Sequence, residues 1–179
     1  DEEFRLRTKI CGVADPGALQ VSFCPLCGGT GITGILLAGD RVMHIAVHDP
    51  ILTQTAPENQ TLQAEWLAFE SLLAAADVIS CHVPLTVDTH HLFDYEQFAA
   101  MRPTVFFINT SRGGVVSESG LARALHEGRL AGAALDVREN EPPTKGSLEG
   151  HDNVILTPHI GAFTEAAQQR VVESVARDV

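Results

Sequence analysis

The sequence lacks the features that mark several large classes of protein. It carries 12 Lys and Arg against 23 Asp and Glu over 179 residues, a formal net charge of −11, and its basic residues form no cluster. Binding to nucleic acid or to an anionic membrane surface needs clustered positive charge, so neither partner is expected. No apolar run approaches the roughly 20 residues that span a bilayer, and no signal-peptide pattern is present.

Cysteine is scarce too. Four Cys spread over the whole length do not form a disulfide scaffold, which predicts a reduced, cytoplasmic setting. The length suits one domain with a sizeable core. Asp1 in place of a start methionine, and Val179 inside a helical pattern, are consistent with a piece cut from a longer chain.

Short β-branched and apolar runs alternate with helical patterns along most of the chain. This rhythm predicts an α/β fold with a doubly wound parallel sheet. Ser117 is expected to cap a helix over 118–127 that Gly128 ends, and Thr164 to cap the final helix. The strand-like runs lie at 21–24, 42–48, 77–83, 104–108, 130–137 and 154–156, and a brief strand leads into a helix within 65–76.

The glycine-rich stretch supports a dinucleotide-binding interpretation. Gly29 would make a tight turn, Gly31 would let the backbone approach a pyrophosphate, and Gly34 would let a helix from Ile32 to about Ala38 pack on the preceding strand. The N-terminus of that helix would face the phosphates. Asp49 follows the run 42–48, twenty residues after Gly29, where a carboxylate would accept hydrogen bonds from the ribose.

A second interpretation takes Cys24 and Cys27 as half of a zinc site. A structural zinc ion needs four ligands, and Cys11 and Cys81 are single and distant, so free thiols in the core agree better with the spacing. Pro25 falls where the first strand of a dinucleotide fold would run, and proline cannot donate to a sheet ladder.

Three polar residues, Arg112, Glu141 and His159, each follow a strand-like run. In an open α/β sheet, ligands bind at the carboxyl ends of the strands. A guanidinium, a carboxylate and an imidazole gathered there form an acid/base and anion-binding constellation. The alternative is three unrelated loop charges. His90 and His91 have no third ligand at metal-site spacing and are interpreted as solvent-exposed or capping.

From Ala76 to about Thr164 the sequence resembles the cofactor domain of the D-isomer-specific 2-hydroxyacid dehydrogenases. This resemblance implies one Rossmann-like NAD-binding domain over residues 1–179, with 1–20 poorly matched and the substrate domain absent. It rests on the blocks ADVISCHVPLT, INTSRGGVV, GAALDVRENEP and NVILTPHIGA.

The resemblance also implies roles for individual residues. Arg112 would hold the substrate carboxylate and polarise the keto oxygen. His159 would be the acid/base, and Glu141 would fix its tautomer. Asp49 implies NAD over NADP, because a carboxylate would repel a ribose 2′-phosphate. On the cofactor side the resemblance adds Asp136, His82, Val83, Pro84, Thr110 and Ser111.

The function so implied is that of an NAD-dependent oxidoreductase, which interconverts a 2-hydroxy acid and a 2-keto acid by hydride transfer. A homodimer is possible. An alternative within the same superfamily is an NAD(H)-sensing, corepressor-like interaction protein. Nothing in the sequence can build the second domain that closes over the site in this family, so we predict weak or no turnover by this chain.

Overall fold

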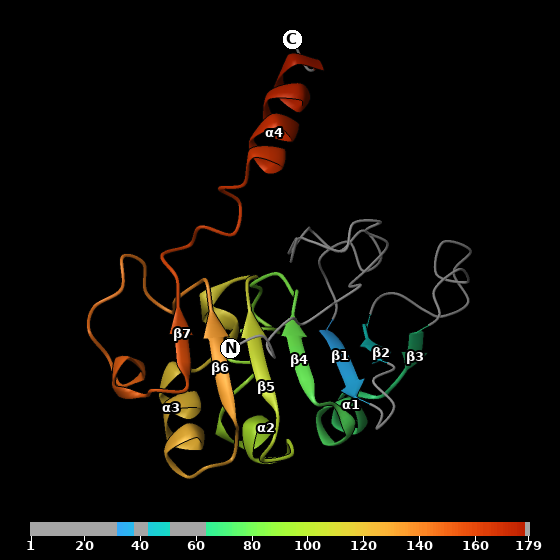
Figure 1. Cartoon of the computed structure of the whole chain (residues 1–179), viewed down its shortest axis with the longest axis vertical. Coiled ribbons are helices and arrows are strands. Elements are labelled where there is room, and N and C mark those ends of the chain that lie inside the picture. Colours follow the sequence, from blue (N-terminus) through green and yellow to red (C-terminus); the bar gives the residue numbers. More distant parts are fainter. Residues whose placement is uncertain (1–31, 38–42, 51–63, 178–179) are drawn as a thin grey trace, which may run out of the picture.

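The computed structural model describes residues 32–37, 43–50 and 64–177. Within these ranges the strands form one sheet in the order β3-β2-β1-β4-β5-β6-β7 (Figure 1). The strands are β1 (Ile32–Leu37), β2 (Met43–His48), β3 (Ala64–Trp66), β4 (Val78–Cys81), β5 (Phe106–Asn109), β6 (Gly132–Leu135) and β7 (Val154–Leu156).

The half of the sheet from β4 to β7 is parallel. Cys81 pairs with Asn109, Asn109 with Leu135, and Leu135 with Leu156, so these strands end level with one another. The loops that follow them therefore meet at one edge of the sheet. This half confirms the expected α/β architecture.

Strand β1 runs in the opposite direction and corrects one prediction. It is antiparallel to both neighbours, with Gly34 paired to Ala46 on β2 and to Ile79 on β4. The helix expected from Ile32 to about Ala38 is therefore wrong, and Gly34 lies inside a strand. Half of the run ITGILL is β-branched, which favours strand over helix, and a helix of about seven residues has little stability of its own.

The helices are α1 (Phe69–Ala75), α2 (Tyr95–Ala99), α3 (Glu118–His126) and α4 (Glu165–Arg177), with short 3-10 turns η2 (Gly113–Val115) and η3 (Leu148–Gly150). The expected caps are confirmed: the Ser117 hydroxyl accepts from the amide of Gly120, that of Thr164 accepts from Ala167, and Gly128 ends α3 with a φ of 67°.

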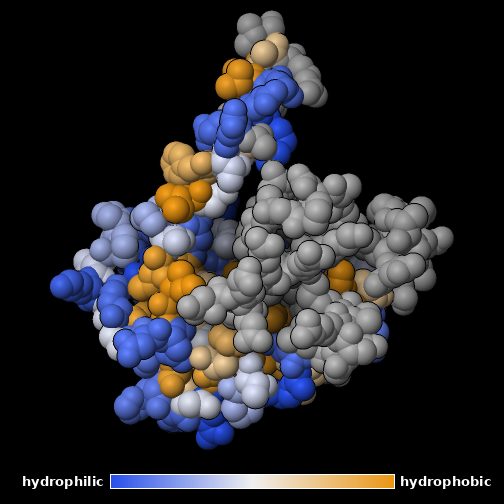
Figure 2. Space-filling view, viewed as in Figure 1, coloured by the Kyte–Doolittle hydropathy of each residue, from blue (hydrophilic) through white to orange (hydrophobic). Residues whose placement is uncertain are grey.

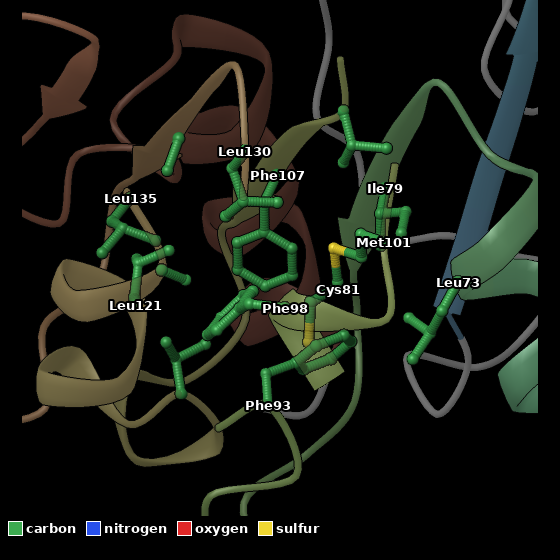
Figure 3. Close-up of a cluster of buried hydrophobic side chains, with 14 of the residues drawn as sticks. Leu73, Ile79, Cys81, Phe93, Phe98, Met101, Phe107, Leu121, Leu130 and Leu135 are labelled. Carbon is green, nitrogen blue, oxygen red and sulfur yellow. The ribbon is translucent and has the colours of Figure 1, made fainter. Parts of the chain in front are cut away.

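Aromatic side chains hold the parallel half together (Figure 3). Phe107 on β5 lies 4.8 Å from Phe93 and 5.2 Å from Phe98 on α2, measured between ring centroids, and all three are fully buried. Burying one such ring contributes about 2–3 kcal/mol. This packing fixes β5 against α2, and with it the start of the loop that carries Arg112.

Helix α4 projects away from the sheet (Figure 1). Its surface mixes polar and hydrophobic residues (Figure 2), and Val172 and Val175 are both exposed. None of the helices that the structure describes has the length and apolar character to cross a membrane.

Candidate active site

The loops after β5, β6 and β7 carry Arg112, Glu141 and His159, as the sequence predicted. Because these strands are parallel and level, the three residues lie at one edge of the sheet. The structure joins two of them directly. Nδ1 of His159 lies 2.8 Å from Oε2 of Glu141, and both side chains are partly exposed to solvent.

The other oxygen of Glu141 is also held. Its Oε1 accepts a hydrogen bond from the backbone amide of Arg138 at 3.1 Å. The hydrogen bond to His159 and the amide of Arg138 together lower the pKa of Glu141 below its usual value. Since Nδ1 of His159 faces this carboxylate, Nε2 is the ring nitrogen left to exchange a proton with a substrate.

Asp136 shapes the loop that presents His159. Its Oδ1 accepts from the Thr157 hydroxyl (2.5 Å) and the Ile160 amide (2.9 Å), and its Oδ2 accepts from the Gly161 amide (2.7 Å). Burial opposes ionisation of Asp136, but these hydrogen bonds outweigh burial and lower its pKa. The backbone of His159 has a φ of 54°, an uncommon conformation outside glycine, and Asp136 holds both sides of it.

Asn109 plays the corresponding part for Arg112. Its buried side chain accepts from the amide and the hydroxyl of Ser111 and donates to the carbonyl of Arg112, at 2.7–3.0 Å. The guanidinium of Arg112 is exposed and donates to the Ser111 carbonyl. Among the described residues it has no carboxylate partner, so it is available to an anionic ligand.

The predicted cofactor-side residues follow β4 and β5. Nε2 of His82 lies 2.9 Å from the Ser80 hydroxyl, and burial lowers the pKa of His82. The Ser111 hydroxyl lies 3.4 Å from Sγ of Cys81, so the ends of the two strands touch. Val83 is buried and Pro84 is exposed, while Thr110 is intermediate.

Other predicted residues are only partly placed. Asp49 is buried directly after β2. Gly29 and Gly31 lie outside the described residues, as do Cys24 and Cys27 of the zinc interpretation.

One interaction at this edge was missed. His91 was expected to be exposed or to cap a helix, but its side chain is partly buried and Nε2 lies 2.8 Å from Oε1 of Glu139. His90 is exposed, as expected, and its ring stacks on that of His91. His91 and Glu139 are 48 residues apart, and no spacing rule connects residues so distant in sequence.

The residues predicted for the nicotinamide and adenosine-ribose ends of NAD lie at this edge of the sheet. Carboxylates lie at the ends of β2 (Asp49) and β6 (Asp136), and the hydroxyl of Ser111 lies between β4 and β5. The residues predicted for the pyrophosphate, Gly29 and Gly31, lie outside the described residues. Within residues 32–50 as described, no helix offers its N-terminus to a phosphate, because β1 is a strand.

Comparison with known proteins identifies related sequences. Residues 29–161 match the family described as D-isomer specific 2-hydroxyacid dehydrogenase, NAD binding domain. A glyoxylate reductase of Thermococcus litoralis is 42% identical over 71% of this chain and 38% of its own length. A D-3-phosphoglycerate dehydrogenase of Bacillus subtilis is 39% identical over 83% of this chain and 30% of its own length.

Solved structures of similar fold agree. The holo form of D-mandelate dehydrogenase from Rhodotorula graminis is 36% identical, with a TM-score of 0.64 over 70% of this chain and 36% of that one. D-lactate dehydrogenase with NAD+ from Lactobacillus jensenii is 30% identical, with a TM-score of 0.65 over 73% of this chain and 42% of that one. The chain therefore spans less than half the length of these relatives.

Proposed function

The chain belongs to the D-isomer specific 2-hydroxyacid dehydrogenase family, and from this premise we propose that it is the NAD-binding part of an enzyme that interconverts a 2-hydroxy acid and a 2-keto acid. The observation that supports the proposal most directly is the 2.8 Å contact between His159 and Glu141. It lies at the same sheet edge as the exposed guanidinium of Arg112.

His159 is the proposed acid/base. NADH, when bound, supplies the hydride that adds to the carbonyl carbon of the keto acid. His159 gives the proton from Nε2 to the carbonyl oxygen, and takes it back in the reverse reaction. Glu141 accepts a hydrogen bond from Nδ1–H of His159, which fixes the orientation of the ring and stabilises the imidazolium that holds the proton.

Arg112 is the proposed binding residue for the substrate carboxylate. Its planar guanidinium can make two parallel hydrogen bonds to a carboxylate, which orients the substrate as well as attracting it. The buried side chain of Asn109 supports the Arg112 loop through hydrogen bonds to the Arg112 carbonyl and the Ser111 hydroxyl. In this proposal Arg112 orients the substrate, and His159 exchanges the proton with it.

Selectivity for NAD over NADP is assigned to Asp49. A carboxylate at the end of β2 accepts hydrogen bonds from a ribose diol and repels a 2′-phosphate. Asp136 and the residues His82, Val83, Pro84, Thr110 and Ser111 complete the proposed cofactor side. Gly34 lies within β1 and so does not have the predicted role of packing a helix on the preceding strand.

We further propose that this chain, taken alone as one NAD-binding unit, catalyses the reaction slowly or not at all. Hydride transfer needs a substrate held in reactive geometry away from water, and the described residues leave His159 and Arg112 open to solvent. The substrate is proposed only as a class, the small 2-hydroxy and 2-keto acids. A homodimer and a cytoplasmic setting remain predictions.

Thermal unfolding with and without NADH, with NADPH as control, tests the proposal. A cofactor at 100 times its dissociation constant adds about 2.7 kcal/mol to the free energy of unfolding. NADH is expected to raise the melting temperature, and NADPH is expected to leave it nearly unchanged. Asp49→Asn should narrow the difference between the two cofactors. No rise with either cofactor contradicts the proposal.

A further inference from the structure

We infer that Arg138 is a positioning residue of this site, which holds segment 138–141 where Glu141 must lie to pair with His159. The inference rests on the proposed function for the meaning of that pair, but not for the geometry. The residue type alone does not predict this positioning role, because an arginine in the loop after a buried strand is ordinarily a surface charge.

The side chain of Arg138 is anchored in an ion cluster whose guanidinium is buried and whose two carboxylates are partly exposed. It is only 6% exposed, and it donates from Nε and Nη2 to both oxygens of Glu118, at 2.9 and 2.8 Å. Its Nη1 donates to Oε1 of Glu149 at 2.9 Å. Glu118 begins α3 and Glu149 lies in η3, so one guanidinium ties the segment to two separate elements.

The backbone around Arg138 passes this anchoring to the catalytic pair. The amide of Arg138 donates to Glu141, whose other oxygen faces His159. The next residue is fastened as well, because the amide of Glu139 donates to Glu118 and the amide of Glu118 donates to Glu139. The anchored side chain of Arg138 therefore holds its own backbone amide in place, and that amide holds the carboxylate of Glu141.

The same segment also touches the loop of Arg112. A Cβ atom added to Gly113 would lie 1.7 Å from the carbonyl oxygen of Arg138. The backbone next to Arg112 is thus packed directly on the backbone of Arg138, at a distance that no side chain permits. Arg138 lies at the junction of the elements that carry Arg112, Glu141 and His159.

Stability alone is a weak explanation for this cluster. A buried ion pair often adds little stability relative to apolar side chains of similar volume, because its charges lose their hydration. The cluster instead fixes an orientation, since the guanidinium fork donates hydrogen bonds to carboxylates in one plane. A positioning role predicts an effect on Glu141 that a purely structural role does not.

The test follows the titration of Glu141 by carbon-13 NMR in the full chain, labelled at glutamate carboxyl carbons and without cofactor. Glu141→Gln identifies the resonance. In Arg138→Met the Glu141 midpoint should move to higher pH, because the carboxylate loses the amide and the histidine that stabilise its charge. Arg138→Lys should restore part of the change. A folded Arg138→Met protein with an unchanged Glu141 midpoint overturns the inference.

Two further variants separate the positioning effect from other consequences of removing an arginine. Arg138→Met leaves Glu118 and Glu149 without their partner, so the triple variant with Glu118→Gln and Glu149→Gln removes those charges at equal volume. It should also raise the Glu141 midpoint, and an unchanged midpoint in it counts against the inference. Arg102→Met is the matched control, because Arg102 pairs with Asp77 before β4 and β5 begin, away from the site.

Failure of this inference and failure of the proposed function give different results. If Glu141 responds to Arg138→Met but NADH leaves the melting temperature unchanged, the positioning role holds and the proposed function falls. If NADH raises the melting temperature but the Glu141 midpoint is unchanged in Arg138→Met, the proposed function stands and the positioning role is overturned.

Discussion

The two halves of the sheet are formed under different constraints. From β4 to β7, the presence and parallel direction of the strands follow from the sequence, because each strand is joined to the next by a long segment, containing a helix in most cases. Only residues 38–42 separate β1 from β2. A parallel crossover needs a dozen or more residues, so β1 and β2 pair antiparallel. The comparison shows that apolar patterning identifies strands, whereas connection length sets their direction.

The largest expected effect comes from breaking the aromatic core of the parallel half. Phe107→Ala should lower the free energy of unfolding by about 3–5 kcal/mol, because it leaves a cavity beside the buried rings of Phe93 and Phe98. Phe106→Ala, one residue earlier and partly exposed, is the matched control and should cost far less. Urea unfolding measures both. Equal losses would mean that the buried face of β5 does not carry the stability of this half.

Next comes the contact between the two loops that lead to the site. Gly113→Ala places a methyl group against the Arg138 carbonyl and should cost about 1–3 kcal/mol by overpacking. Gly114→Ala is the control, because its added methyl group meets only the flexible end of Leu85. Urea unfolding should separate the two variants. A Gly113→Ala protein as stable as Gly114→Ala would show that the loops can move apart freely.

Acid should weaken the parallel half through three carboxyl groups. Folding lowers the pKa of Glu118, Asp136 and Glu141 from usual values of 4.5, 3.8 and 4.5. Between the folded and unfolded values the unfolded chain binds more protons, so this stability is present above the unfolded values and is lost as pH falls below them. Urea midpoints measured from about pH 6 to about pH 3 should fall, and less steeply in Asp136→Asn.

The smallest effect is expected in the β1–β2 connection. Inserting five Gly and Ser residues within 38–42 doubles its length and should cost only about 0.6 kcal/mol. The cross-strand pairing of Gly34 with Ala46 should persist, as judged by NMR contacts between their backbones. Loss of that pairing would mean that the short connection alone holds β1 antiparallel.

The sequence predicted those parts of the site that depend on strand ends. Arg112, Glu141 and His159 were found because each follows an apolar run, and the direction of parallel strands then brings their loops together. The Ser117 cap was found because capping is local. The helix at Ile32 was predicted wrongly, since a glycine spacing outweighed a β-branched run.

The remaining interactions join residues distant in sequence, and local patterns do not report them. Arg138 reaches Glu118 across 20 residues, and His91 reaches Glu139 across 48. The loop contacts of Asp136 span 21–25 residues. Such pairs depend on how the loops pack, which periodicity and spacing rules do not specify.

The φ of 54° at His159 has a consequence for how this protein can evolve. Few side chains accept such a backbone, with Gly, Asn, Asp and His among the most tolerant. Of these, only His changes protonation near neutral pH. A single base change in either His codon gives Asn, which would keep the backbone conformation of the loop and lose the titratable imidazole. The backbone thus leaves a one-step route from the proposed acid/base residue to a side chain that fits the same loop but does not titrate near neutral pH.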